Sequence, residues 1–258
     1  MRVQPAERHL TEDDIAAFER DGYVVRRGMF TPDEIAQIAA WTDEVQRLPE
    51  VPGKYMMYFE TSLLEPGRRV IQRIENFSPY HAGFARLFDA PQMCGAVGQL
   101  FGEPAVLFKE KINFKLPGGD GFKPHQDQQA GWTVYADLFV TAMVSIDDTS
   151  LENGCLELAA GQHGRGLIGS EWTPLTDADM RAMDARPYPT RAGDVIFFDS
   201  YTPHGSKPNP TSSPRRVLYI TYNKLLKGDH RVRYYADKRA SFPPDIERDP
   251  GRTYTFRV

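Results

Sequence analysis

The chain changes character at Gly102, and this change limits its possible folds more than any other feature. Residues before Gly102 carry mainly helical patterns, whereas those after it form short apolar runs separated by turn signals rich in Gly, Asn and Asp. Many short strands preceded by helices are typical of a β-sandwich or barrel with helices on one side. The sequence therefore predicts a mainly β fold with flanking helices. The apolar runs span residues 105–116, 138–146, 155–158, 194–198 and 217–223.

Helix start signals occur in the N-terminal part of the chain. Thr11 stands before three acidic residues, the pattern of a helix N-cap followed by an acidic first turn. Thr31 is followed by a proline and then by Glu34, which predicts a second helix with a capping box. A further helical region covers residues 84–101 and is interrupted by Pro91.

The chain has 258 residues, of which 41% are hydrophobic, so it can bury a sizeable core. No internal repeat, low-complexity tract or linker divides it, and we predict one domain over residues 1–258. Within it we expect N-terminal helices over about 11–101 and a strand-rich core over about 102–225. The tail, 226–258, is rich in charge, Pro and Tyr, and we expect it to wrap the surface of the core.

Charge and hydropathy argue against several classes of protein. The formal net charge of −4 is unlike that of a nucleic-acid-binding protein. No apolar run approaches the roughly 20 residues that a membrane-spanning helix needs, so we expect no membrane partner. The first residues lack the apolar region of a secretory signal, and we expect a cytoplasmic protein. Cys94 and Cys155 form no CxxC motif, as expected for two buried free thiols in a reducing compartment.

Three residues form a candidate metal site. His125 and Asp127 are two positions apart, so on an extended segment their side chains lie on the same side. His204 follows an apolar run at 195–198 and stands in a turn rich in Pro and Gly. Two histidines and one carboxylate can occupy one face of an octahedron and leave three positions open, as in non-haem Fe(II) oxygenases. A metal-free surface turn is the simpler alternative for the first two residues alone.

Two further residues favour iron with a keto-acid co-substrate. Arg215 follows His204 by eleven residues, and its planar guanidinium matches a carboxylate. Ser206 can donate a hydroxyl to the same carboxylate. An α-keto acid would fill two open positions of the metal and O₂ the third. The sequence thus predicts Fe(II), 2-oxoglutarate and O₂ as the reactive partners.

These motifs resemble those of the phytanoyl-CoA dioxygenase family of Fe(II)/2-oxoglutarate oxygenases. The resemblance rests on His125-Gln126-Asp127, on Pro203-His204-Gly205-Ser206, on Arg215, and on the turns at 152–154 and 161–163. It implies a double-stranded β-helix, a cupin-like jelly-roll whose two sheets enclose the iron. Residues 111–115 resemble a strand of ectoine-hydroxylase-like members, which implies that Asn113 touches the co-substrate carboxylate nearest the iron. Lys111 departs from that strand, where arginine is usual.

The substrate is expected to be a small molecule. The stretches around 203–223 and 234–248 resemble bacterial members that act on small polar molecules such as 2-aminoethylphosphonate. Related halogenases lack the metal-binding carboxylate, so the presence of Asp127 implies hydroxylation of a C–H bond. Arg73 and Lys109 are candidates for an anionic group of the substrate. Trp132 and Tyr135 are candidates for packing on an ammonium group.

Each substrate candidate has a structural alternative. Arg73 can form a surface salt bridge, and the two aromatic residues can belong to the core. Lys109 and especially Lys115 can lie on a solvated strand face. At the level of function, the alternatives are an amino-acid-like or acyl substrate, a zinc metallohydrolase, an inactive binding protein of the same fold, and a carbohydrate-binding jelly-roll. The oligomeric state cannot be read from the residues.

Overall fold

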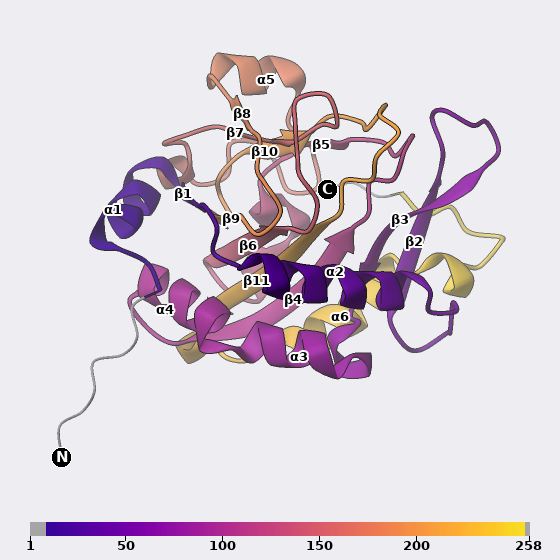
Figure 1. Ribbon diagram of the computed structural model, residues 1–258, viewed down its shortest axis with the longest axis horizontal. Helices are drawn as coiled ribbons and strands as arrows, with labels where there is room; N and C mark the ends of the chain where they lie inside the picture. Colours follow the sequence, from indigo (N-terminus) through magenta and orange to yellow (C-terminus); the bar gives the residue numbers. More distant parts are fainter. Residues whose placement is uncertain (1–8, 256–258) are drawn as a thin grey trace.

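The computed structural model describes residues 9–255 and contains two β-sheets. The large sheet has the strand order β1-β9-β6-β11-β4-β3-β2, and the small sheet has the order β5-β10-β7-β8. Helices α2, α3 and α4 lie along one side of the large sheet, and the small sheet lies on the other side (Figure 1). This arrangement is the predicted jelly-roll with flanking helices.

The strands and helices have the following bounds. The large sheet comprises β1 (Tyr23–Arg26), β2 (Met56–Thr61), β3 (Arg69–Glu75), β4 (Ala105–Asn113), β6 (Phe139–Ser145), β9 (Val195–Asp199) and β11 (Val217–Lys224). The small sheet comprises β5 (Phe122–His125), β7 (Leu156–Leu158), β8 (Arg186–Tyr188) and β10 (His204–Ser206). The α-helices are α1 (Glu12–Asp21), α2 (Pro32–Gln46), α3 (Ala82–Asp89), α4 (Ala96–Phe101), α5 (Asp177–Ala182) and α6 (Arg231–Ser241).

The helix start signals predict the first two helices correctly. The side chains of Thr11 and Thr31 accept hydrogen bonds from the backbone N–H groups of Asp14 and Glu34, and both capping boxes are complete. The helical region before Gly102 is divided by a π-helical turn that begins at Pro91. That proline lacks the N–H that a continuous α-helix would need there.

Strand side chains of the large sheet alternate between two environments. Leu218 and Ile220 of β11 belong to the core under the helices, whereas Tyr219 belongs to the core between the sheets. The neighbouring Thr221 also lines the cavity between the two sheets. The period of two along each strand therefore separates a purely apolar face from a face that carries polar groups.

Two features differ from the sequence expectation. Strands β2 and β3 lie within the segment that was expected to be helical, and they extend the large sheet beyond β4. Their mixed apolar and charged residues conceal the alternation that identifies a half-buried strand. The C-terminal tail contains helix α6, whose many charged residues obscure its apolar face. Helix α6 matters for the site because the ring centre of its Tyr234 lies 5.4 Å from Nζ of Lys109, which lines the cavity.

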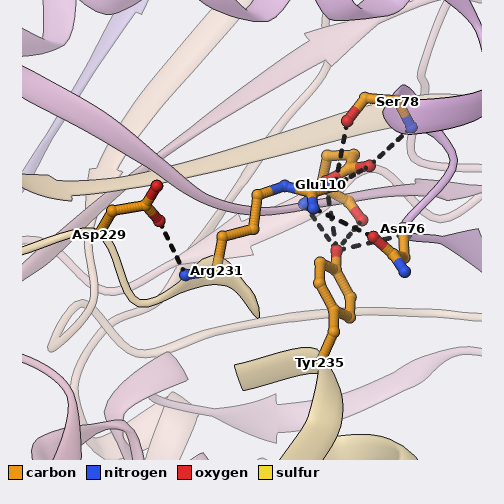
Figure 2. A network of polar contacts seen from close by, with 6 residues as sticks. All are labelled: Asn76, Ser78, Glu110, Asp229, Arg231 and Tyr235. Carbon is orange, nitrogen blue, oxygen red and sulfur yellow. Dashed lines mark hydrogen bonds and ion pairs between the residues drawn. The ribbon is translucent and has the colours of Figure 1, made fainter. Parts of the chain in front are cut away.

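A buried polar network fixes α6 against β4 (Figure 2). Arg231 donates to both carboxylate oxygens of Glu110, at 2.6 and 2.7 Å. The Tyr235 hydroxyl accepts from the backbone N–H groups of Glu110 and Asn76 and donates to the carbonyl of Glu110. The Tyr235 hydroxyl thus pairs with the backbone N–H and carbonyl groups of β4 beyond the end of β3. A further strand would otherwise pair with these groups.

Candidate metal centre and its cavity

The small sheet places the two histidines side by side. His204 of β10 pairs directly with His125 of β5, and their ring centroids are 4.3 Å apart. These two histidines are 79 positions apart in the sequence, and they meet because β5 and β10 are neighbours in the antiparallel small sheet. The pairing brings together the two motifs that the sequence predicted to share a metal.

Asp127 completes the group just after β5. Its Oδ1 atom lies 3.8 Å from Nε2 of His125 and 3.9 Å from Nε2 of His204. One ligand atom from each residue can be chosen so that all three lie within 4.8 Å of one another. Two imidazole nitrogens and a carboxylate oxygen at this spacing suit a divalent iron ion with open positions.

Hydrogen bonds fix the tautomer of both histidines. Nδ1 of His125 lies 2.7 Å from the carbonyl of Lys123, and Nδ1 of His204 lies 2.9 Å from the carbonyl of Thr202. A carbonyl only accepts, so each Nδ1 carries the hydrogen and each Nε2 keeps a lone pair for a metal. Burial, together with the neighbouring His204, lowers the pKa of His125 to about 3, and burial also lowers the pKa of His204.

Asp127 is held in its charged form. Burial acts to raise the pKa of Asp127, but the two histidines and the neighbouring lysines outweigh it and hold that pKa below its usual value. The hydroxyl of Thr141 donates to Oδ2 of Asp127 at 3.2 Å and contacts the hydroxyl of Thr221 at 2.9 Å. Neutral histidines and an oriented carboxylate are the protonation states that metal binding requires.

The triad opens into a narrow cavity between the two sheets. The triad residues themselves and Gly205 belong to its wall. The other lining residues from the large sheet are Lys109, Lys111, Asn113, Thr141, Tyr219 and Thr221. Those from the small sheet and the loops are Phe122, Trp132, Leu156 and Ser206. Asp127 is the only carboxylate among the described lining residues.

Two lysines of β4 face this cavity, and we call Lys109, Lys111 and Trp132 the lysine cluster. Nζ of Lys109 lies 5.0 Å from the ring centre of Trp132, and Nζ of Lys111 lies 4.8 Å from that of Tyr219. Within residues 9–255, neither ammonium group forms an ion pair or a hydrogen bond. Burial, followed by repulsion from Lys109, lowers the pKa of Lys111 to about 8. Asp127 and Glu75 act on Lys111 only at longer range, where they oppose the lowering of its pKa. The cluster is therefore a pair of enclosed cations that form no ion pair within the described residues.

A second cationic group, which we call the arginine cluster, consists of Arg215, Lys115 and Ser206. Arg215 is 1% exposed, and its Nε and Nη2 atoms have no hydrogen-bond partner among the described residues. Asn113, which lines the cavity, has a buried Oδ1 atom that likewise lacks a partner there. Buried donors without acceptors are costly, so the two Arg215 atoms fit a carboxylate ligand, whereas Oδ1 of Asn113 is an acceptor that needs a donor. The residues present therefore suit a dicarboxylic keto acid.

The expectation that Lys115 lies on a solvated strand face is wrong. Lys115 is 2% exposed, and its Nζ donates to Oγ of Ser206 at 2.8 Å. The strand β4 ends at Asn113, so Lys115 does not continue the alternation that the sequence suggested. The chain turns inward there, and the ammonium group is enclosed between the sheets.

Two of the four substrate candidates line the cavity, and the other two lie outside its described lining. Lys109 and Trp132 line the cavity. Arg73 is buried outside the described lining, where it pairs with Glu75 at 2.8 Å. Tyr135 also lies outside that lining, and its hydroxyl donates to Asp237 at 2.7 Å. Nζ of Lys109 already faces the Trp132 ring, so that ring contacts a cation of the protein itself.

Sequence reasoning missed several cavity residues. Lys111 was recognised only as a departure from a family strand, although it faces the triad. Thr141 and Thr221 form a cross-strand pair on β6 and β11. A signal for them exists in the sequence, because a lone threonine within an otherwise apolar run must satisfy its hydroxyl when buried. Tyr219 lies in a similar run but gives no such signal.

Comparison with known proteins agrees with this site. The family model for phytanoyl-CoA dioxygenase matches residues 18–217. The chain is 40% identical to a 2-aminoethylphosphonate dioxygenase of the uncultured bacterium HF130_AEPn_1, over 96% of this chain and 94% of the relative. It is 37% identical to a methylphosphonate hydroxylase of Gimesia maris, over 90% of this chain and 88% of that one.

Solved structures agree on the fold. The protein EctD from S. alaskensis, solved with 2-oxoglutarate and 5-hydroxyectoine, superposes with a TM-score of 0.73 at 22% identity. The match covers 87% of this chain and 80% of that one. Fold, metal-ligand set and relatives together define an Fe(II)- and 2-oxoglutarate-dependent dioxygenase. The chain belongs to the phytanoyl-CoA dioxygenase family. None of its described helices is long and apolar enough to cross a membrane.

Proposed function

We propose that this dioxygenase hydroxylates a small organophosphonate, with His125, Asp127 and His204 as the iron ligands. Arg215 and Ser206 would hold the distal carboxylate of 2-oxoglutarate, and Asn113 the carboxylate nearest the metal. The bound iron and co-substrate supply the oxidation of a C–H bond by O₂, with succinate and CO₂ as co-products. The two guanidinium donors of Arg215 that lack a protein partner support the contact with the distal carboxylate.

The observation that carries the substrate class is the lysine cluster. Lys109 and Lys111 are 6% exposed and half-buried respectively, face the triad, and lack a carboxylate partner among the described residues. Two buried cations favour a ligand that brings two negative charges, because an unpaired buried charge is costly. A phosphonate group carries up to two negative charges on a compact set of three acceptor oxygens. The two relatives that are 40% and 37% identical to this chain are named for phosphonates.

The cavity is walled by side chains of both sheets and leaves little free space around the triad. A confined site of this kind supports a compact substrate over a long acyl chain.

The protein side chains would position the reacting C–H bond. The lysine cluster would fix the phosphonate at one side of the triad, and the rings of Trp132 and Tyr219 would limit how far the group can move. Phe122 and Leu156 add apolar surface that excludes water from the same space. Thr141 keeps the Asp127 carboxylate oriented throughout. A substrate held at its phosphonate end would present the adjacent carbon to the metal side.

The test is succinate release by the Fe(II)-loaded enzyme with 2-oxoglutarate and O₂, with the organic product identified by mass spectrometry. The panel comprises 2-aminoethylphosphonate, methylphosphonate, the carboxylate counterpart β-alanine, and an acyl-CoA ester. We expect substrate-dependent succinate and a hydroxylated product from a phosphonate only. Equal turnover of β-alanine or of the acyl ester would contradict the proposed substrate class. Hydrolysis independent of 2-oxoglutarate would instead favour a metallohydrolase.

A further inference from the structure

The amino group of Lys115 is buried, and all its hydrogen-bond partners are neutral groups. Its Nζ lies 2.8 Å from Oγ of Ser206 and 3.4 Å from the carbonyl oxygen of Gly154, and it also contacts the carbonyl of Lys207. In the ammonium form, these three oxygens can accept its three N–H bonds. No carboxylate of the described residues lies within ion-pair distance of Nζ. The side chain therefore acts on the site through Ser206.

The backbone of Lys115 is held in an unusual conformation. Its φ angle is +35°, a region that residues other than glycine rarely adopt. The carbonyl of Lys115 accepts from the backbone N–H of Arg215 at 3.2 Å and from Nδ2 of Asn209 at 2.9 Å. Such strain persists when surrounding contacts enforce it, and it concentrates at functional sites. The same contacts tie Lys115 to the segment that carries Arg215.

The direction of the Ser206 hydroxyl depends on the proton of Lys115. When Nζ is an ammonium group, Oγ of Ser206 must accept, so its own O–H can donate into the cavity that Ser206 lines. When Nζ is neutral, its two N–H bonds suffice for the two carbonyls. Its lone pair then accepts the O–H of Ser206, and that hydroxyl cannot donate to a ligand. The two protonation states therefore offer opposite hydrogen-bonding polarity at Oγ.

We infer that Lys115 is a positioning residue for 2-oxoglutarate: the distal carboxylate selects the ammonium form, so co-substrate binding moves a proton from the buffer to Nζ of Lys115. The proton turns the Ser206 O–H toward the carboxylate and adds a positive charge beside it. This inference rests on the proposed contact of Ser206 and Arg215 with the distal carboxylate. It is independent of the phosphonate proposal, because the substrate takes no part in the step.

The electrostatics of the free site agree with this geometry. Burial, followed by repulsion from Arg215, lowers the pKa of Lys115 to about 6, while Glu60, Asp120 and Cys155 act weakly in the opposite direction. Without co-substrate, Lys115 is therefore mainly neutral at pH 7.5. A carboxylate nearby favours the ammonium form and raises this pKa. By linkage, the affinity for 2-oxoglutarate falls as the pH rises above about 6.

The experiment is calorimetric titration of the Fe(II)-loaded protein with 2-oxoglutarate without O₂, at pH 7.5, in buffers of different ionisation enthalpy. The slope of the binding enthalpy against buffer enthalpy counts the protons taken up. We expect roughly one proton per 2-oxoglutarate, as linkage to a neutral lysine requires. Pyruvate chelates a metal in the same way but lacks the distal carboxylate, and we expect almost no uptake with it. This comparison uses the unaltered protein.

Variants then locate the proton. Lys115→Met should abolish the uptake and weaken 2-oxoglutarate binding about tenfold, as loss of one charged hydrogen bond implies. Lys227→Met is the matched control, because that exposed side chain pairs with Asp137 and not with any residue of the arginine cluster among the described residues. Unchanged uptake in Lys115→Met, or equal uptake with pyruvate, would overturn the inference while leaving the iron and co-substrate sites in place. Failure of 2-oxoglutarate to bind at all would instead contradict the proposed co-substrate residues.

Discussion

Two groups of cationic side chains are enclosed in the fold, and they are built differently. In the arginine cluster, the planar guanidinium of Arg215 holds its donors in a rigid fork, and the hydroxyl of Ser206 is bound by Lys115. In the lysine cluster, the ammonium groups of Lys109 and Lys111 touch aromatic rings and have no directional partner among the described residues. Fixed donors suit a planar carboxylate that every turnover must bind identically. Point charges suit a tetrahedral group whose oxygens can rotate.

The comparison teaches how one cavity can separate two anions. Both ligands are negatively charged, so net charge alone cannot direct each to its place. The directional donors of the arginine cluster and the ammonium groups of the lysine cluster can discriminate between the two anions by their shape. If this division is correct, substitutions in one cluster leave the affinity for the other ligand nearly unchanged.

The largest effect is expected from Arg215→Met. Two hydrogen bonds from a buried guanidinium to a carboxylate are worth about 1.5–3 kcal/mol each, so the affinity for 2-oxoglutarate should fall by about 100-fold or more. Iron affinity should change little, because Arg215 is not part of the triad. Anaerobic absorption titrations of Fe(II) and of the co-substrate measure the two separately. An equal loss of affinity for Fe(II) and for 2-oxoglutarate would contradict the role assigned to Arg215.

Lys111→Met should act on the other ligand. We expect KM for the phosphonate to rise by about 10- to 100-fold through loss of one charged contact, while 2-oxoglutarate affinity stays within about twofold. The measurement is initial-rate kinetics with each substrate varied in turn. Lys123→Met, an exposed lysine on β5, serves as the matched control and should show neither effect. A larger change for 2-oxoglutarate than for the phosphonate would reverse the comparison.

Tyr235→Phe should have the smallest effect on catalysis. It removes the hydroxyl that satisfies the edge of β4 and should lower the free energy of unfolding by about 1–3 kcal/mol. Because α6 also carries Tyr234, which faces Lys109 at 5.4 Å, phosphonate KM should rise only a few-fold. Denaturant unfolding and kinetics measure the two effects, with the exposed Tyr80→Phe as control. A change in the affinity for 2-oxoglutarate, without a change in KM for the phosphonate, would contradict the assignment of α6 to the lysine cluster.

The triad could be predicted from the sequence because its chemistry is local and specific. His125 and Asp127 share a side through simple strand alternation, and His204 follows a recognisable apolar run. The jelly-roll class also follows from the series of short apolar runs and turns. Helix α6 was missed because its apolar face is interrupted by charged residues that the Glu110 network neutralises only in the folded state.

The cationic clusters were harder to predict for a different reason. Lysines on an alternating strand usually face water. Here the rings of Trp132 and Tyr234 cover Lys109, and those of Phe122 and Tyr219 cover Lys111. Lys115 lies beyond the end of β4, where its positive φ redirects the side chain. Arg73 was a reasonable anion-binding candidate, but Glu75, two residues later on the same strand, is its partner.

The central claim is that a phosphonate binds beside the iron through Lys109 and Lys111. Phosphorus NMR tests it most directly, because Fe(II) broadens the resonance of a nearby phosphorus atom. In the anaerobic Fe(II)–2-oxoglutarate enzyme, we predict broadening of the 2-aminoethylphosphonate or methylphosphonate signal. The broadening should disappear in a variant carrying both Lys109→Met and Lys111→Met and persist in Lys123→Met. Absence of broadening in the unaltered enzyme, or its persistence without the two lysines, would contradict the account.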